Sequence, residues 1–471
     1  MIAAALAGCG TTTYFAGRTL PPSELANRIL IAIQNPSTIS SGTLQFVDAY
    51  YDIRFKYNSA NTGPAFNIAG YSGNLPVTIQ NMPEELGGAV YSSGDGSFTL
   101  ISYSQEKSNG AVNGLNGHSS SVFTTRNQSY VFAANQASHV LTVVDKSATI
   151  PGSYAFSLPG VYRVSVNPGG SAALAFVQNS NYVYYPRKLT AAQTSAYSGG
   201  PSTWPLGAVD CEPQNAPGWC LFQALSPNDN LPLVFDRPVK AVFSADGGTA
   251  YVLNCGPECG GATASVTPLP VAPLIYLVGQ QSGALPTHSA LASSTIPIPG
   301  GASNALDTTS SALNNIPVLY VVGQAQSGGY WGGNLTVVNL STNKISSSVS
   351  ISDGAPGAVS RMIEADDNTL WIGMTQCTNG VRAATGLPYG CLTMYNTSTS
   401  KVTLLEPYIG DATGIAAVSG LHKIYTAEGG QVYIYSTIDG SALDNQFVTV
   451  TGTAYDVAYM DGLSDANNTV Y

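Results

Sequence analysis

The chain has 471 residues, of which 17 are Lys or Arg and 27 are Asp or Glu, so only 9% carry charge. Soluble domains usually carry about 25%. The formal net charge of −10 excludes the basic surface that a nucleic-acid backbone requires. A hydrophobic content of 44% excludes a disordered chain. The sequence contains no run of about 18 apolar residues, the length that a membrane-spanning helix requires.

The first residues resemble an export signal. Residues 6–9, Leu-Ala-Gly-Cys, resemble the lipobox of bacterial lipoproteins, in which the chain is cut before the cysteine and lipid is attached to its sulfur. This resemblance implies a signal segment at 1–9, lipid attachment at Cys9 and a polar tether at 10–27, and Gly10 favours the outer membrane. A frayed apolar N-terminus is the alternative, because no basic residue precedes Cys9.

A unit of two strands joined by a turn recurs along the chain. In residues 239–254, apolar and polar residues alternate, an Asp-Gly-Gly turn follows, and a second stretch is rich in strand-forming residues. Asp-Gly provides the positive φ that a tight hairpin needs. The second strands of these units are expected to start near Arg28, Gly88, Ser129, Ser171, Thr249, Val318, Thr369 and His422.

Two further strands follow in most units. Third strands end in Asp or Asn, whose side chains initiate turns, at 44–48, 141–145, 335–339 and 392–396. Fourth strands are expected at 295–298, 348–351, 402–405 and 447–450. Repeated units of four antiparallel strands are typical of a β-propeller. We predict an all-β propeller of eight blades, with seven as the alternative because the unit at 88–117 is short.

The two ends of the repeat predict how the propeller closes. The first unit starts directly on a second-type strand at 28–34, and a spare strand follows the last unit at 453–459. Pairing of these two strands would complete the first blade and remove an open sheet edge. We therefore expect one propeller domain at 28–460 and a tail at 461–471.

These units resemble the YVTN-type repeats of bacterial surface and periplasmic propellers, a family that overlaps in sequence with lactonase-like propellers. The resemblance covers about residues 28–459 and is strongest at 239–254. It implies the propeller fold and an exported protein of the cell envelope, either anchored to the outer membrane or extracellular. It implies no single function, because propellers serve binding, scaffolding and catalysis.

Loop insertions interrupt the repeat at about 186–236, 255–270 and 378–390. Six cysteines fall in local pairs in or beside them, which in an exported protein indicates disulfides. Metal binding is the rival interpretation, but there is no C-x-x-C motif and the histidines lie far away in sequence. The expected pairs are Cys211 with Cys220, Cys255 with Cys259, and Cys377 with Cys391.

Several of the scarce charges fall on the expected first strands of the blades or on loops leading into them. First strands line the central channel of a propeller, so these charges are candidates for binding a ligand at the channel mouth. Ion pairs that close the channel are the alternative. The candidates are Glu84, Glu85, Arg163, Asp236, Arg237, Lys240, Asp307, Arg361, Asp411 and Asp456.

The sequence favours a non-catalytic binding or scaffold protein that recognises a glycan or a protein at the cell surface. Exposed Tyr and Trp beside Asn and Ser suit neutral sugars. A self-assembling coat or fibre subunit is the first alternative, because a surface with few charges repels its own copies weakly. A lactonase-like hydrolase is the second, although no catalytic motif, metal-ligand set or cofactor-binding pattern is found. We expect no nucleic-acid partner, and membrane contact only through the lipid anchor.

Overall fold

The computed structural model describes residues 20–37, 41–55, 65–147, 151–213, 218–310, 315–327, 330–351, 358–377, 389–405 and 410–462. Cys9 and the rest of the predicted signal segment lie outside these stretches. The contacts of the chain divide it into two compact units. Of the described residues, unit 1 takes those in Met1–Ala111 and Ser360–Thr469, and unit 2 takes those in Val112–Val359.

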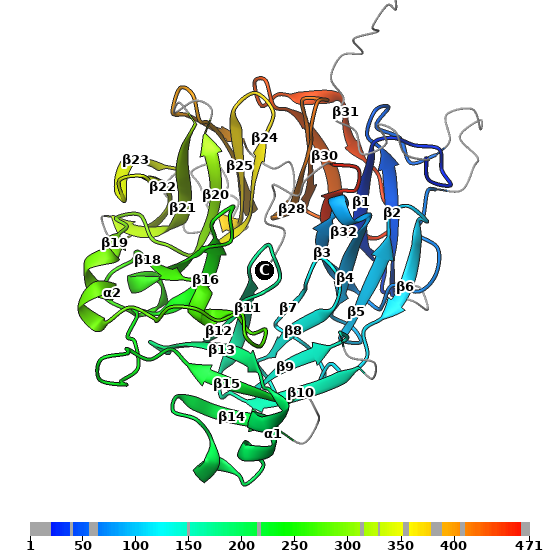
Figure 1. Ribbon diagram of the computed structural model, residues 1–471. Helices are drawn as coiled ribbons and strands as arrows, with labels where there is room; N and C mark the ends of the chain where they lie inside the picture. The colour runs from blue at the N-terminus through cyan, green and yellow to red at the C-terminus, as the bar shows by residue number, and fades with distance from the viewer. Residues whose placement is uncertain are drawn as a thin grey trace, which may run out of the picture. The chain divides into compact units, whose positions relative to one another are not determined.

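Unit 1 contains four antiparallel sheets (Figure 1). Three of them have four strands in chain order, and the fourth joins both ends of the chain in the order β2-β1-β32. Its elements are β1 (Arg28–Gln34), β2 (Gly42–Asp48), β3 (Pro76–Met82), the 3₁₀ helix η1 (Pro83–Glu85), β4 (Gly87–Ser92), β5 (Ser97–Ser102), β6 (Lys107–Ala111), β24 (Ala358–Ala365), β25 (Thr369–Cys377), β26 (Tyr389–Asn396), β27 (Lys401–Leu405), β28 (Ala412–Val418), β29 (Lys423–Glu428), β30 (Gln431–Ser436), β31 (Ala442–Val448) and β32 (Thr453–Tyr459).

Unit 2 contains four more antiparallel sheets, one of which has five strands in the order β11-β12-β13-β15-β14. Its strands are β7 (Ser121–Thr124), β8 (Tyr130–Asn135), β9 (Val140–Asp145), β10 (Gly152–Ser157), β11 (Val161–Val166), β12 (Ala173–Val177), β13 (Val183–Lys188), β14 (Ala208–Glu212), β15 (Trp219–Gln223), β16 (Pro238–Phe243), β17 (Thr249–Asn254), β18 (Ser265–Pro270), β19 (Ile296–Pro297), β20 (Asn304–Ser310), β21 (Ile316–Ser327), β22 (Tyr330–Asn339) and β23 (Lys344–Ser350). Its helices are α1 (Ala191–Tyr197), η2 (Pro201–Thr203), η3 (Gly256–Cys259), η4 (Ala272–Leu274) and α2 (His288–Ser294).

These eight sheets are the blades of a β-propeller, which confirms the predicted all-β class and the larger of the two blade counts. The expected second strands are β1, β4, β8, β12, β17, β21, β25 and β29. The unit at 88–117 is complete, because β3 precedes it and pairs with β4 along its whole length. Sequence patterning missed β3 because polar Thr78, Gln80 and Asn81 are buried in it.

Burial within a blade falls from the inner to the outermost strand. The second strand β8 is buried throughout, whereas the outermost strands β6 and β23 are largely exposed. Apolar clusters join consecutive blades within each unit, as where Leu253 of β17 meets Val321 of β21. An inner strand is thus covered on both faces, and this explains why β1 is a continuous apolar run rather than an alternating one.

The first strands share a bulge that positions their side chains. In five blades the register between first and second strands shifts near the start of the first strand, so that one extra residue is inserted there. Such bulges re-aim the neighbouring side chains and are frequent beside functional sites. The residues that directly follow the bulge are Thr78, Arg163, Lys240, Gly414 and Asp456.

The predicted closure by the last strand is confirmed. β32 pairs antiparallel with β1 from Ile29 opposite Tyr459 to Gln34 opposite Thr453, and the two strands lie side by side in Figure 1. This blade has three strands instead of the expected four. At its outer edge, isolated contacts replace a fourth strand: Gln45 forms a bridge with Asn67, and the Phe46 N–H donates to the Phe66 carbonyl.

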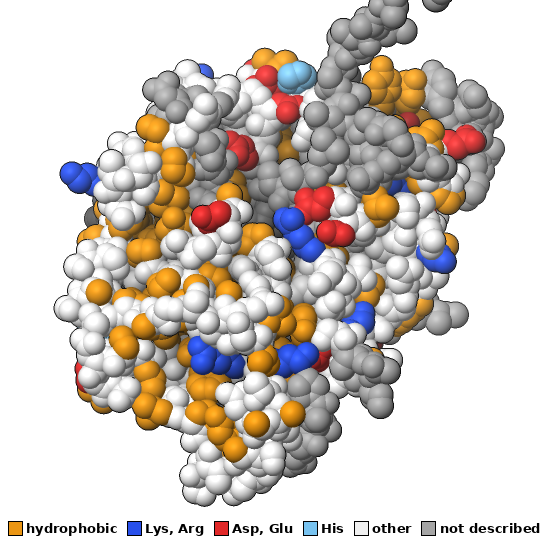
Figure 2. Space-filling model, in the orientation of Figure 1, with side chains coloured by type: hydrophobic (Ala, Val, Ile, Leu, Met, Phe, Trp, Pro, Cys, Tyr) orange, Lys and Arg blue, Asp and Glu red, His pale blue; other side chains and the backbone are white. Residues whose placement is uncertain are grey.

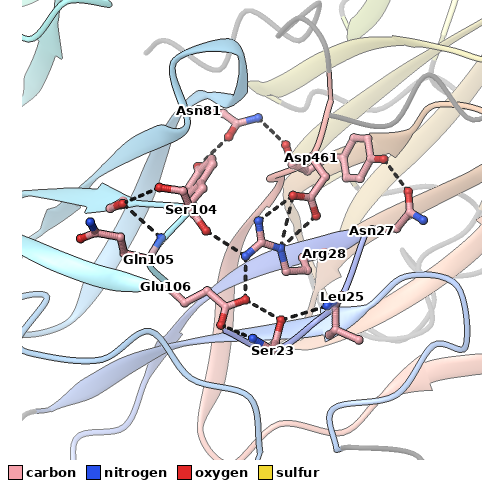
Figure 3. A network of polar contacts seen from close by, with 12 residues as sticks. Ser23, Leu25, Asn27, Arg28, Asn81, Ser104, Gln105, Glu106 and Asp461 are labelled. Carbon is pink, nitrogen blue, oxygen red and sulfur yellow. Dashed lines mark hydrogen bonds and ion pairs between the residues drawn. The ribbon is translucent and has the colours of Figure 1, made fainter. Parts of the chain in front are cut away.

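A buried ion-pair network holds both ends of the repeat in unit 1 (Figure 3). Arg28 is completely buried, and its guanidinium lies 2.6 Å from Asp461 and 2.7 Å from Glu106. Ser23 donates from its hydroxyl to Glu106 at 2.5 Å. Ser23 belongs to the segment expected to be a tether and Asp461 to the expected tail, so both segments reach into the core beside β1.

The insertion at 186–236 enlarges one blade of unit 2. It carries α1 and η2 and supplies two strands: β15 pairs with β13 in the fourth position, and β14 adds a fifth at the edge. The predicted Cys211–Cys220 disulfide joins β14 to β15 and is present. The α1 helix begins at a capping box, in which Thr190 accepts from the Gln193 N–H.

The second insertion is shorter than expected. The predicted Cys255–Cys259 disulfide is present and closes η3, but Ser265–Pro270, assigned to the insertion by sequence, forms β18. A further excursion between β18 and β19 carries η4 and α2 and was not expected. Cys391 is disulfide-bonded as well; the side chain of its predicted partner Cys377, and residues 378–388 of the third insertion, lie outside the described part of the chain.

Candidate functional site

The structure brings together two of the predicted channel residues in unit 1. Arg361 of β24 forms an ion pair with Asp456 of β32, although these strands belong to blades that are not consecutive. Asp456 also accepts a hydrogen bond of 2.8 Å from the Ile79 N–H of β3. One carboxylate therefore links the first strands of three blades. Arg361 and Asp456 thus form an ion pair between first strands and are not free to bind a ligand.

The space for this ion pair comes from a glycine. Gly414 of β28 follows the bulge of its strand, as Asp456 does in β32, and a Cβ at Gly414 would lie 2.5 Å from the Asp456 carboxylate. Burial raises the pKa of Asp456, while the Arg361 charge opposes that shift. The absence of a side chain at Gly414 thus allows the carboxylate to reach its partners.

Unit 2 carries two basic residues at the position that follows the bulge. Lys240 of β16 is buried, and its ammonium donates to Asn304 Oδ1 of β20 at 2.7 Å. Arg163 of β11 is half-buried, and its guanidinium lies 5.5 Å from the ring centroid of Tyr162. The Tyr162 hydroxyl in turn donates to the Val239 carbonyl of β16 at 3.2 Å.

Asp236 and Arg237 have a structural role in the loop before β16. The Asp236 carboxylate accepts from the backbone N–H groups of Ala262 at 2.9 Å and Thr263 at 2.6 Å, so it holds the loop that follows η3. Arg237 donates to the Asn179 carbonyl of the preceding blade. These contacts explain both charges without a ligand.

The remaining candidates are dispersed. Glu84 and Glu85 lie in η1, after β3, and therefore at the opposite end of the first strand from the loop that leads into it. Asp411 directly precedes β28, where its carbonyl accepts from the Gly429 N–H. Asp307 lies on β20, opposite Leu319, but its side chain is outside the described part of the chain.

A pair of exposed tyrosines in unit 1 was not singled out as a site by the sequence. Tyr50 and Tyr51 follow β2, are 59% and 50% exposed, and pack edge to face with ring centroids 4.8 Å apart. Their turn is held by Asp48, whose carboxylate accepts from the Tyr50 N–H at 2.9 Å. The signal in the sequence is the Tyr-Tyr-Asp run that begins two residues after a strand ending in Asp48.

The neighbouring blade fixes the backbone of this turn. Lys423 of β29 donates to the Tyr50 carbonyl at 3.3 Å and to the Asp52 carboxylate at 2.8 Å. The Tyr425 hydroxyl donates to Asp52 as well, and burial raises the pKa of Tyr425. The two aromatic rings therefore stand on a backbone held by charge-assisted hydrogen bonds, although they are themselves exposed to solvent.

Tyrosine rather than tryptophan supplies the exposed aromatic surface. Trp219 and Trp371 are completely buried, and Trp204 and Trp331 are half-buried. Figure 2 shows a face on which white and orange side chains prevail and charged side chains are sparse. The low charge content of the sequence is therefore visible on this face.

The described residues contain neither a cluster of metal ligands nor a membrane-spanning helix. No group of three His, Cys, Asp or Glu side chains within them is arranged to hold a metal ion. None of their helices combines the length and the apolar character needed to cross a membrane. The disulfides indicate that the chain folds in an oxidising compartment rather than in a reducing cytosol.

Comparison with solved structures shows the propeller fold. A dihydro-heme d1 dehydrogenase matches 94% of this chain with 77% of its own, at 12% identity and a TM-score of 0.53. A putative 6-phosphogluconolactonase from Bacteroides fragilis matches 94% with 99% of its own, at 8% identity and a TM-score of 0.47. Hydrazine synthase from Kuenenia stuttgartiensis matches 78% with 96% of its own, at 13% identity and a TM-score of 0.44. No family model and no curated protein matches the chain.

Proposed function

We propose that this propeller is an exported, non-catalytic binding module, and that its ligand is a neutral glycan held by Tyr50 and Tyr51. The observation that carries the proposal is the exposed tyrosine pair on a turn fixed by Lys423 and Asp52. Single exposed apolar side chains are common on protein surfaces, whereas exposed apolar side chains that lie together mark interaction sites. Their electron-rich faces attract the C–H groups of a sugar ring, and their hydroxyls donate and accept hydrogen bonds.

The fixed backbone of the turn supports this proposal. A ligand loses less affinity to ordering when the groups that bind it are already held in place. Tyrosine adds little further cost, because it has only two side-chain torsions to restrict. A neutral ligand also fits a chain with only 9% charged residues, since such a chain has few groups to capture a charged partner at long range.

Export is part of the proposal. The disulfides support it, because they form in oxidising compartments. The lipobox-like residues before Gly10 and the resemblance of the repeats to YVTN-type propellers support it as well. Anchoring to the outer membrane through Cys9 is the form of export that we propose, and labelling with a radioactive fatty acid in a bacterial host tests it against a Cys9→Ser variant.

A glycan array followed by calorimetric titration tests the ligand. We expect the protein to bind at least one neutral oligosaccharide, and the double variant Tyr50→Ala/Tyr51→Ala to lose about tenfold or more of that affinity, as expected for a central aromatic contact. Tyr71→Ala is the matched control, because Tyr71 is 54% exposed but lies on a different turn, where it donates to Asp95. Unchanged affinity in the double variant would reject the tyrosine site, and an array without any neutral ligand would reject the function.

A second candidate is packing against another copy of the chain, and the exposed aliphatic residues around the insertion in unit 2 favour it. Leu206 and Leu231 are 68% and 58% exposed, and Val209 lies on the edge strand β14. Sedimentation of the wild type and of a Leu206→Ser/Leu231→Ser variant tests this alternative. Self-association that the variant abolishes would establish it.

A further inference from the structure

Arg163 differs from the other arginines near the first strands. Arg361 is paired with Asp456, and Arg237 donates to a backbone carbonyl. Within the described residues, by contrast, the Arg163 guanidinium has neither a carboxylate nor any other hydrogen-bond acceptor, and its contact is with the Tyr162 ring. A guanidinium has five N–H donors, and removing them partly from water without an acceptor costs free energy.

The local fold places this guanidinium beside Tyr162, whose side chain connects the blade of β11 with the blade of β16. The bulge in β11 inserts Tyr162 directly before Arg163, and Tyr162 spans to β16 through its hydroxyl, which bonds the Val239 carbonyl. Burial raises the pKa of Tyr162, and the nearby Arg163 charge opposes that rise. The Arg163 guanidinium thus lies beside the Tyr162 ring, and no acceptor among the described residues takes its N–H groups.

We propose that Arg163 binds the carboxylate of a small ligand on the first strands of unit 2. A planar guanidinium matches a carboxylate with two parallel hydrogen bonds, and stacking on an aromatic ring orients its plane. The neighbouring Lys240, at the same position of the next blade, already donates to Asn304. This site is separate from the tyrosine pair of unit 1 and does not depend on the proposed glycan binding.

Two sources of such a carboxylate are separable by experiment: a uronic acid and the C-terminus of a peptide. Calorimetric titration of the full chain with sodium glucuronate and with N-acetylalanine tests both, and glucose and N-acetylalanine amide are their uncharged counterparts. We expect saturable binding of at least one carboxylate probe and a clearly weaker response to its uncharged counterpart. The probe that binds more tightly identifies the source.

Variants assign the binding to Arg163. Arg163→Gln keeps a polar side chain but removes the charge, and we expect it to weaken carboxylate binding by about tenfold or more, since hydrogen bonds to charged groups are among the strong ones. Arg163→Lys keeps the charge without the planar fork and should give an intermediate affinity. Arg126→Gln, in the exposed turn between β7 and β8 of the same unit, should bind as the wild type does.

Three results would overturn the proposal: a wild type that binds neither carboxylate better than its uncharged counterpart, an Arg163→Gln variant with wild-type affinity, or an equal loss in Arg126→Gln. Thermal unfolding of each variant shows whether a loss of binding reflects unfolding. If Arg163→Gln fails to fold, Arg163→Lys decides the question, because wild-type affinity in that variant excludes bidentate recognition.

Discussion

Three arginines show how this chain treats a buried or half-buried positive charge. Arg28 has two carboxylate partners, Arg361 has one, and Arg163 has none within the described residues. Breaking a buried ion pair usually costs about 3–5 kcal/mol, because it leaves the other charge uncompensated. The first two arginines are therefore explained by structure alone, and the third is the residue for which a ligand has to be sought.

The Arg28 network predicts a specific pH dependence of stability. Burial raises the pKa of Asp461 to about 6, against the opposing charge of Arg28. The folded state therefore holds the proton of Asp461 more tightly than the unfolded chain does. The stabilisation that results from this proton is fully present below about pH 4 and is lost as the pH rises through about 6. The size is about 1.4 kcal/mol for each unit of pKa shift.

Chemical unfolding between pH 4 and pH 7.5 checks this prediction by comparing the wild type with Asp461→Asn, which cannot titrate. The unfolding free energy of the wild type should fall relative to that of the variant as the pH rises. Asp439→Asn is the control, because hydrogen bonds from Ser441 lower the pKa of exposed Asp439, so the contribution of that carboxyl to stability is lost only as the pH falls below about 4 and this variant should run parallel to the wild type between pH 4 and pH 7.5. Parallel profiles for wild type and Asp461→Asn would contradict the prediction.

At the scale of elements, the turns could be predicted from the sequence and the bulges could not. The Asp-Gly-Gly turn after Phe243 identifies a hairpin because Gly247 has a φ of +70° there, whereas the second strand of the first blade, β1, was located by its apolar run. A bulge leaves no such mark, since any residue can be the inserted one. The equivalence of Arg163, Lys240 and Asp456 was therefore hidden in the sequence.

The contacts of the last strand, β32, indicate what its removal would do to stability. β32 pairs with β1, and it buries Val457 and Tyr459 together with the Asp456 carboxylate that links three first strands. Each large apolar side chain that loses its burial costs about 1.5–3 kcal/mol, and domains are stable by only about 5–15 kcal/mol. Ending the chain after Gly452 should therefore abolish cooperative unfolding of unit 1.

Circular dichroism during heating measures this effect, and a chain that ends after Gly462 is the matched control. The longer truncation product keeps β32 and Asp461, so its melting temperature should stay close to that of the full chain. An unchanged melting temperature after removal of β32 would show that the pairing of β1 with β32 contributes nothing to stability.

At the scale of the whole molecule, the low charge content is now tied to particular positions. Several of the charges near the first strands are engaged with each other or with backbone groups, as Asp456 and Asp236 show. The sequence correctly predicted the fold class and the blade count, because these follow from turns and apolar patterning that are local in the chain. It also predicted the closing strand, because the first unit lacks a first strand and the last unit is followed by a spare one. It could not pair Arg361 with Asp456 or find the support of Tyr50 by Lys423, because such contacts join residues distant in sequence.

The two proposed sites should differ in their response to salt. The screening length falls from about 10 Å at 0.1 M to about 3 Å at 1 M salt, which weakens a contact between charges and hardly affects the stacking of a neutral sugar on Tyr50 and Tyr51. Titrations at 0.1 M and 1 M sodium chloride should therefore show a marked loss of glucuronate affinity at Arg163 and nearly constant affinity for a neutral oligosaccharide. The Arg163→Gln variant should retain the salt-independent glycan binding, since the turn of Tyr50 and Tyr51 is held by Lys423 and Asp52 and not by Arg163. Glycan binding that falls with salt as steeply as glucuronate binding would mean that a charged group, and not the tyrosine pair, holds the sugar.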